Sequence, residues 1–260
     1  MRRDAVRLLP LLAPIFAIGL SSICAATARG DLVSIAATRD ATLYQSADGS
    51  IANGAGQSFF AGKTNQSMIR RALINFDVAS YIPEGATITA ARLTLNLAQV
   101  NGGARSVSIH RSLSSWTSGA SDPTDNEGAG APALIDDATW LYSSYDGAGG
   151  GVAWTTAGGD FGAFASDTIM TDALGLYTWS SLGILNDVRL FANDPSQNFG
   201  WFILGDESIA GTARRFDSCD SAAAGGVVPQ LEIEFTSVPN PGPIALLVLA
   251  GVFASNRKRG

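Results

Sequence analysis

The sequence predicts an all-β protein: a two-sheet antiparallel β-sandwich, jelly-roll-like, with one short internal helix and an apolar helical segment at each terminus. Three observations support this prediction. Short segments alternate apolar and polar residues at every second position, which is the pattern of half-buried strands. Glycine is frequent, at 29 of 260 residues, and turn-forming residues separate the segments. Runs with the 3.6-residue period of a helix are concentrated at the two ends.

The first 28 residues have the layout of a secretory signal peptide. A basic start at residues 1–7 precedes an apolar stretch at residues 8–23, and Ala26-Thr27-Ala28 forms a small-residue cleavage motif. This pattern predicts that signal peptidase removes residues 1–28 during export. The domain is then expected to cover residues 29–238.

The first predicted strand covers residues 31–44, and a loop rich in Gly, Asn and Asp follows it. Residues 70–97 form the centre of the predicted fold, as two strands joined by a turn. Pro83 and Gly85 predict the turn, because Pro fixes φ and Gly tolerates positive φ. Alternation puts one set of apolar side chains on the inner face: Ala72, Ile74, Phe76, Val78, Leu93, Leu95 and Leu97.

The later elements are predicted from shorter segments. Val107, Ile109 and Leu113 continue the apolar alternation, and residues 119–151 then form a long polar, glycine-rich loop. A loop of this length in a compact domain is usually functional or mobile. Residues 182–190 predict the helix, and residues 199–204 and 231–235 predict the last strands. The predicted core comprises Ala72, Ile74, Phe76, Leu93, Leu95, Val107, Ile109, Ile203, Leu231 and Ile233.

Residues 239–260 form a tail of a different composition. It joins a Pro-rich motif, an apolar run at residues 244–255 and a basic end; the motif is Pro239, Asn240, Pro241 and Gly242. The apolar run is shorter than the ~20 residues of a stable transmembrane helix, and basic residues after it favour the cytoplasmic side. The tail therefore predicts a transient membrane anchor, the alternative being a helix packed on the domain.

The charge distribution argues against nucleic acid as a partner. The formal net charge is −6, yet both ends of the chain are basic, so the domain between them is more acidic than the whole. Lys63 is the only lysine before the tail. Phosphate contacts need clustered Lys and Arg, which this domain does not offer in its sequence.

Several motifs of the domain occur in a defined order. Residues 76–95 contain Phe-Asp, a short hydrophobic link, and Ile-Pro-Glu-Gly-Ala-Thr-Ile-Thr-Ala-Ala-Arg-Leu-Thr-Leu; matching segments follow at residues 106–116, 138–140, 154–160, 198–204 and 229–233. Together they resemble the DNRLRE family, also called disaggregatase-related, over roughly residues 36–235. The resemblance implies a secreted β-sandwich module of the kind found in polysaccharide-associated proteins. Relatives commonly carry a basic residue at the position of Cys219, so this chain departs from the family there.

The tail resembles the PEP-CTERM sorting signal, which also joins a Pro-rich motif, a short apolar helix and a basic end. Asn240 stands where that motif usually has Glu. The resemblance implies transient anchoring in the inner membrane, followed by removal of the tail by an exosortase-type sorting protease. The expected location is extracellular or on the bacterial cell surface.

Candidate catalytic and metal-binding residues are few. His110 is the only histidine, so a zinc site built on several histidines is excluded. A Ser-His-Asp triad would require His110 beside a serine and a carboxylate. Asp122, Asp125 and Glu127 lie in one loop, and two interpretations remain: a structural Ca²⁺ site, since Ca²⁺ takes carboxylate oxygens, or a solvated acidic loop.

Aromatic and arginine side chains are the better candidates for binding. Trp140, Tyr142 and Trp154 border the long loop and could stack on sugar rings; the alternative is that they cap one end of the sandwich. Arginines at strand positions could bind an acidic polysaccharide, because guanidinium groups match carboxylates. The alternative is cross-strand ion pairing with Asp77, Glu232 and Glu234. The arginine candidates are Arg70, Arg71, Arg92 and Arg111, and Arg214 and Arg215 occupy similar positions.

The sequence therefore predicts an exported, non-catalytic module that binds or scaffolds extracellular polysaccharide, acidic or neutral. Two alternatives remain open. One is a purely structural surface or matrix protein without a specific ligand, and the other is a polysaccharide-degrading enzyme. The single predicted domain fills the mature chain, which argues against a separate catalytic domain.

Overall fold

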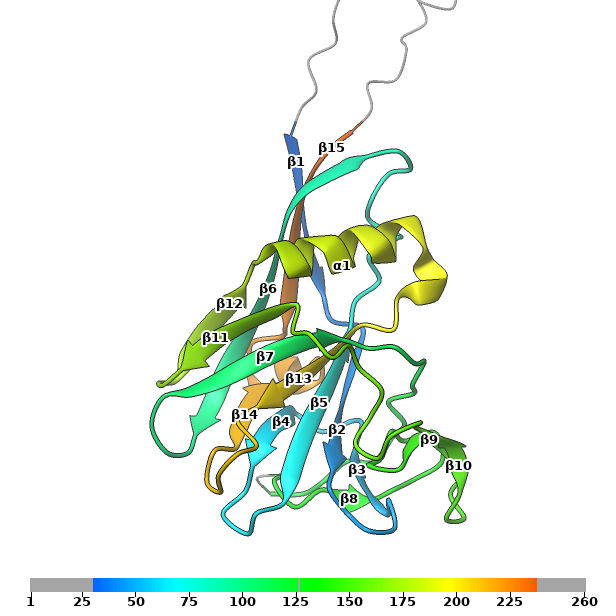
Figure 1. The fold of residues 1–260 in the computed structure, drawn as a ribbon, viewed down its shortest axis with the longest axis vertical. Helices are drawn as coiled ribbons and strands as arrows, with labels where there is room; N and C mark the ends of the chain where they lie inside the picture. The colour runs from blue at the N-terminus through cyan, green and yellow to red at the C-terminus, as the bar shows by residue number, and fades with distance from the viewer. Residues whose placement is uncertain (1–29, 126, 238–260) are drawn as a thin grey trace, which may run out of the picture.

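The computed structural model describes residues 30–125 and 127–237 (Figure 1). The predicted signal peptide and the predicted sorting tail, including Pro239, Asn240, Pro241 and Gly242, lie outside the described residues, and so do the two apolar terminal segments. Within the described ranges, no helix is both long and apolar enough to cross a membrane.

The described chain is mostly antiparallel β-sheet with one short α-helix, as predicted. The strands are β1 Gly30–Ala36, β2 Arg39–Tyr44, β3 Ile51–Asn53, β4 Ser58–Lys63, β5 Ile69–Asn75, β6 Thr87–Val100, β7 Arg105–Arg111, β8 Ala131–Pro132, β9 Tyr142–Tyr145, β10 Gly151–Ala153, β11 Asp167–Thr171, β12 Gly175–Trp179, β13 Trp201–Gly205, β14 Arg214–Asp217 and β15 Gln230–Thr236. The helix is α1, Leu182–Asn193, and two 3₁₀ turns are η1, Pro195–Gln197, and η2, Ser221–Ala224.

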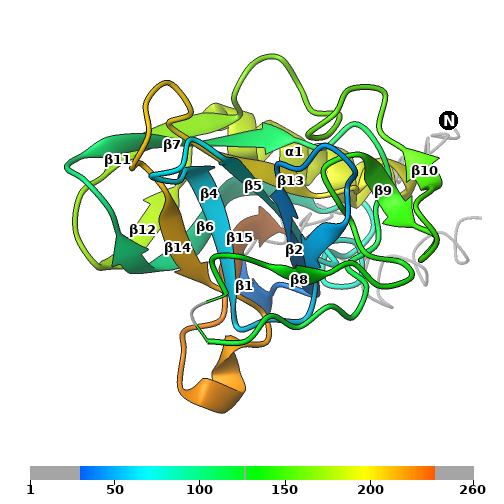
Figure 2. The ribbon, with the colours of Figure 1, turned by 90° about the horizontal axis from the view of Figure 1, so that it is seen from below.

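One continuous sheet contains 13 of these strands, along the path β1-β15-β6-β14-β4-β5-β13-β7-β11, with β12, β2, β3 and β8 attached to it. The strand β4 leads from one half of the sheet to the other. Its first residues pair with β14, whereas Gly62 and Lys63 pair with β5. Gly62 has φ of +114°, and a side chain there would lie 2.8 Å from the Thr212 carbonyl oxygen. Only glycine fits this change of direction. Figure 2 shows the strands on either side of β4.

Apolar side chains from both halves of the sheet meet in one main core. All ten residues predicted for the core are buried in this cluster, which confirms the predicted strand faces. Trp179, Trp201 and Phe216 are fully buried in the same cluster, and the rings of Trp179 and Phe216 lie 6.5 Å apart. Strand alternation in the sequence therefore located the core correctly.

The helix α1 packs against β6 beside this core (Figure 1). Its start is capped by Ser181, whose Oγ accepts a hydrogen bond from the Gly183 amide at 3.1 Å. The buried side chains of α1 recur at helical spacing: Ile184, Leu185, Val188 and Phe191. The predicted helix at residues 182–190 is thus confirmed and is three residues longer.

A second, smaller core covers the outer face of β5 and β13. Leu73 and Phe202 are buried there against Trp116, Trp140 and Trp154, which come from the long connection after β7. The strand β5 is therefore buried on both faces. Periodicity alone identified only its inner face, because the outer cover comes from a segment distant in sequence.

Two boundaries differ from the prediction. Residues 31–44 form two strands, since β1 pairs with β15 and β2 pairs with β5 on the other half of the sheet. Leu113 is 50% exposed and does not continue the alternation, because β7 ends at Arg111. The predicted loop at residues 119–151 contains β8 and β9.

Candidate functional site

A pocket of about 550 Å³ is lined by residues of β6, β14, β4 and β5 and of the loops beside them. These four strands run side by side in the sheet (Figure 2). We call this cavity the arginine pocket. It is lined by Phe60, Thr64, Asn65, Gln66, Met68, Arg70, Gln99, Asn101, Gly128, Ala129, Ala213, Arg214 and Arg215. None of these described lining residues is Asp or Glu, although the domain as a whole is acidic.

The pairing register explains why side chains from four strands converge there. Gln99 on β6 is opposite Arg215 on β14, and Arg215 is opposite Phe60 on β4. Arg70 on β5 is opposite Gly62, two residues beyond Phe60. Because side chains alternate along a strand, these residues share one face of the sheet, opposite the main core.

A β-bulge sets this arrangement. Phe216 pairs with Leu97, but Arg215 pairs with Gln99, so Ala98 is the extra residue on β6. Beyond the bulge Val100 packs against the main core, and Gln99 turns outward into the pocket. Bulges commonly re-aim side chains beside functional sites in this way.

Two guanidinium groups in the pocket have unused donors. Arg70 is only 9% exposed and lies 4.5 Å over the ring of Tyr44. Its Nη1 donates to its own neighbour Ile69 at 3.0 Å, and burial lowers the pKa of Arg70. The Nε–H groups of Arg70 and Arg215 are buried and have no acceptor in the described part of the chain. Such donors are costly unless a ligand or water accepts from them.

Amide side chains surround the two arginines. Gln66, Gln99, Asn65 and Asn101 make no side-chain hydrogen bond to any residue that the structure describes. Each amide offers both donors and an acceptor, which suits ligand hydroxyl groups. Phe60 and Met68 add an apolar surface. The pocket can therefore hold a polar, anionic ligand that also has an apolar face.

The segment that carries Gly128 and Ala129 is held over the pocket by Glu127. The Glu127 carboxylate accepts the backbone N–H groups of Gln57 and Ser58 at 3.0 and 2.9 Å. Its carbonyl oxygen accepts the Tyr44 hydroxyl at 2.8 Å, and its φ is +62°. Glu127 is therefore an anchor for this segment.

This role conflicts with one of the two interpretations of the loop, a structural Ca²⁺ site at Asp122, Asp125 and Glu127. The Glu127 carboxylate is buried and bonded to backbone amides, whereas Asp122 and Asp125 are exposed. Across residues 30–125 and 127–237, no three His, Cys, Asp or Glu side chains form a group that could hold a metal ion. The spacing in the sequence did not reveal that the Glu127 carboxylate accepts hydrogen bonds from backbone amides.

The other predicted arginines lie outside the pocket and have acidic partners. Arg71 makes two 2.8 Å bonds to Glu207, and Arg92 pairs with Glu234 at 2.6 Å. Arg111 lies 3.7 Å from Asp187. The cross-strand alternative thus applies to Arg92, and only Arg70 of the four candidates belongs to the pocket.

The predicted aromatic residues are largely internal. Trp140 and Trp154 are 8% and 5% exposed and belong to the second core, so their indole faces lie inside the domain. Trp154 donates its Nε1–H to Thr139 at 2.9 Å, and Arg71 stacks over Trp140 at 5.0 Å. Tyr142 is half-buried, and its hydroxyl donates to Gly149 at 3.0 Å. Capping of the sheet is the better interpretation for the two tryptophans.

His110 lies on β7 away from the arginine pocket. Its Nδ1 is 2.8 Å from the Gly162 carbonyl oxygen and its Nε2 is 3.0 Å from Ser108 Oγ. Neither His110 nor Ser108 lines the arginine pocket. The contacts of the imidazole therefore connect β7 to the following loop.

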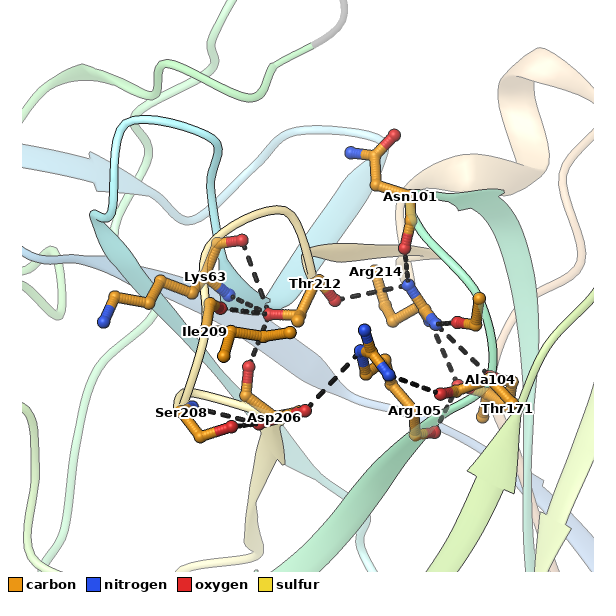
Figure 3. Close-up of polar contacts among 11 residues, drawn as sticks. Lys63, Asn101, Ala104, Arg105, Thr171, Asp206, Ser208, Ile209, Thr212 and Arg214 are labelled. Carbon is orange, nitrogen blue, oxygen red and sulfur yellow. Dashed lines mark hydrogen bonds and ion pairs between the residues drawn. The ribbon is translucent and has the colours of Figure 1, made fainter.

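A buried arginine supports one side of the pocket (Figure 3). Arg214 is fully buried, and its guanidinium donates to four backbone carbonyl oxygens. The distance is 2.6 Å to Gly103 and 3.3 Å to both Thr171 and Thr212, and the fourth acceptor is Asn101. Its Nε donates to the Thr171 hydroxyl at 3.1 Å. These described acceptors are all uncharged. The guanidinium ties β14 to the turn between β6 and β7 and to the end of β11.

The sequence offered Arg70, and Arg214 and Arg215 at similar strand positions, but it did not point to Gln99. The adjacent pair Arg214 and Arg215 was a usable signal, since neighbours on a strand face opposite ways. The bulge on β6, which turns Gln99 into the pocket, leaves no clear sequence pattern. A scan against protein-family models finds no family that matches this chain, and a search of curated proteins finds no relative.

Proposed function

We propose that this chain is an exported, non-catalytic module that binds extracellular polysaccharide, with the arginine pocket as its ligand site. The observation that carries the proposal is the pair of buried, unused Nε–H donors of Arg70 and Arg215 in one pocket. The strand arrangement supports the finer description of a jelly-roll-like two-sheet sandwich, with the DNRLRE family as the proposed relationship.

An acidic glycan fits this pocket better than a neutral one. A carboxylate on a sugar ring can accept from the guanidinium groups, and charge-assisted hydrogen bonds are the stronger kind. The amides of Gln66 and Gln99, which have no partner among the described residues, suit the sugar hydroxyls, while Phe60 offers a face for ring C–H groups. The negative charge of the domain opposes binding at long range, but physiological salt screens it beyond about 10 Å.

The export route is proposed from the two ends of the sequence. A signal peptide at residues 1–28 implies signal peptidase, and the tail at residues 239–260 implies an exosortase-type protease and a transient inner-membrane anchor. The mature module would then act outside the cell or on its surface.

A purely structural role in a surface or matrix is the second candidate. Arg71, Arg92 and Arg111 have acidic partners within the fold, and the predicted tryptophans are buried. These observations favour a structural use for most of the residues that the sequence offered for binding. The arginine pocket is the feature that this second candidate leaves unexplained.

Binding to acidic and neutral polysaccharides, measured by affinity gel or glycan array, separates the two candidates. We expect wild-type protein to retain an acidic polysaccharide and Arg215→Gln to weaken retention about ten- to hundredfold. The matched control is Arg92→Gln, which removes a half-buried arginine outside the pocket and should bind like wild type. If wild-type protein retains no polysaccharide, or if Arg215→Gln binds equally well, the structural role replaces this proposal.

A further inference from the structure

The Asn101-Gly102 peptide lies in the exposed turn between β6 and β7. We infer that it is a self-modifying site, at which Asn101 loses ammonia through a cyclic imide and forms an isoaspartyl link, promoted by the buried guanidinium of Arg214. Three features of the turn support this inference. The Asn101 carboxamide is exposed, the attacking backbone nitrogen belongs to a glycine, and the Arg214 guanidinium contacts the peptide group that reacts.

The carboxamide and the nucleophile are both accessible. Asn101 and Gly102 are exposed, and the Asn101 side chain points away from the surrounding hydrogen bonds (Figure 3). The Gly102 N–H donates to no acceptor within residues 30–125 and 127–237. Gly102 has φ of +70° and no Cβ to hinder ring closure. The two reacting atoms, Gly102 N and Asn101 Cγ, are four bonds apart in the chain, so attack is intramolecular and closes a five-membered ring.

Arg214 contacts the same peptide group that must react. Its Nη1 donates to the carbonyl oxygen of Asn101, and that carbonyl belongs to the peptide bond whose nitrogen is Gly102 N (Figure 3). When Gly102 N loses its proton, negative charge spreads onto this oxygen. A fixed guanidinium there stabilises the anion, in the manner of preorganised donors at an oxyanion. The second terminal nitrogen of Arg214, Nη2, donates to the Gly103 carbonyl oxygen at 2.6 Å and fixes the turn.

The reaction needs only water. A solvent base takes the Gly102 amide proton, and Gly102 N forms a bond to Cγ of Asn101. The bond from Cγ to Nδ2 then breaks, and ammonia leaves after taking up a proton. Water adds to one of the two imide carbonyls and breaks one of its bonds to nitrogen. Opening on the Cγ side gives aspartate, and opening on the backbone side gives isoaspartate.

The position of Arg214 favours the isoaspartyl product. Opening on the backbone side turns the carbonyl carbon that Arg214 contacts into a free carboxylate. A fully buried cation with only uncharged acceptors among the described residues would thereby gain a negatively charged partner. Buried charges are strongly stabilised by such pairing.

Asn53-Gly54 is a second Asn-Gly pair in the described chain, and there Asn53 is buried and both residues are hydrogen-bonded. Asn53 is buried, and its side chain donates to Ser58 at 2.9 Å and accepts from Gly56 at 2.9 Å. The Gly54 N–H donates to Ser121 at 3.0 Å. Both reacting groups are therefore held in hydrogen bonds, and this second site is expected to resist the reaction.

The test follows both sites in the folded full-length chain, kept in mildly alkaline buffer at body temperature. Peptide mapping by mass spectrometry and an enzymatic isoaspartate assay measure the conversion at Asn101 and Asn53. A synthetic peptide of residues 99–105 gives the rate without Arg214, and Asn101→Gln is the matched control, because ring closure from Gln is much slower.

We expect Asn101 in the folded chain to react about tenfold or more faster than in the peptide, the factor of one hydrogen bond to a charged group. The isoaspartyl share should also be larger, Asn53 should stay intact, and Asn101→Gln should show no product at that position. A folded chain that converts Asn101 no faster than the peptide, or converts Asn53 equally fast, would overturn the inference. Neither result depends on whether the arginine pocket binds a polysaccharide.

Discussion

Asp40 on β2 is a buried carboxyl group in a crowded acidic region. It is 4% exposed and accepts the Cys219 N–H at 2.6 Å. Burial raises the pKa of Asp40 to about 7, and the charges of Asp220 and Glu127 add to the effect. The folded protein therefore holds a proton on Asp40 at a pH where an unfolded chain, with a pKa of about 3.9, has lost it.

This difference predicts that the domain loses stability as pH rises from about 4 to about 7. The folded state binds more protons than the unfolded state in this interval, so the free energy of unfolding decreases with pH. Asp40→Asn should flatten the profile, because it removes the titrating group. Urea unfolding at a series of pH values measures the slope, with exposed Asp122→Asn as the control. Parallel profiles for wild type and Asp40→Asn would contradict this assignment.

At the scale of single residues, the sequence located the core side chains but only the arginines of the pocket. The inward direction of Leu95 follows from alternation alone, since every second residue repeats it. The outward direction of Gln99 depends on the bulge at Ala98, and the use of Glu127 depends on backbone amides of Gln57 and Ser58. Contacts of this kind join segments far apart in the chain, and no local pattern encodes them.

At the scale of elements, the two central strands carry the main core. Phe76→Ala or Leu95→Ala should lower the free energy of unfolding by roughly 2–5 kcal/mol, because each leaves a cavity in a fully packed cluster. Leu176→Ala on β12 is the control, since Leu176 is exposed, and it should change stability by less than about 0.5 kcal/mol. Denaturant midpoints measure all three variants. Equal midpoints for Leu95→Ala and Leu176→Ala would show that the assigned strand faces are wrong.

The segment over the arginine pocket depends on one anchor. Glu127→Ala leaves the buried N–H groups of Gln57 and Ser58 without their acceptor, at a cost of about 1–3 kcal/mol for each unsatisfied group. We expect lower thermal stability together with weaker polysaccharide retention. Exposed Asp122→Ala should alter neither property. Wild-type stability in Glu127→Ala would show that the anchor does not hold this segment.

Alternation in the sequence did not predict which strands pair with one another. The strand β4 was not singled out by the sequence, yet it joins the two halves of the sheet through Gly62. The single predicted strand at residues 31–44 changes partner between β1 and β2. Changes of sheet depend on which strands are neighbours in space. Alternation within one segment does not contain that information.

At the scale of the whole molecule, the two ends of the described chain lie together. Gly30 at the start of β1 pairs with Thr236 at the end of β15, and both lie at the top of Figure 1. The turn between β4 and β5, which borders the arginine pocket, lies at the opposite end in the same view. A domain held by its C-terminal tail would therefore direct its pocket away from the membrane.

The proposed removal of both terminal segments can be tested on protein from the native host. If both ends serve only export, the mature protein needs neither residues 1–28 nor the tail, because β1 and β15 complete the sheet without them. We expect intact-mass analysis to find a chain that starts near residue 29 and lacks the sequence after about Pro239. Recombinant full-length chain is the mass reference. A soluble native product that still carries Arg257, Lys258 and Arg259 would count against removal of the tail, since the basic end follows the apolar run.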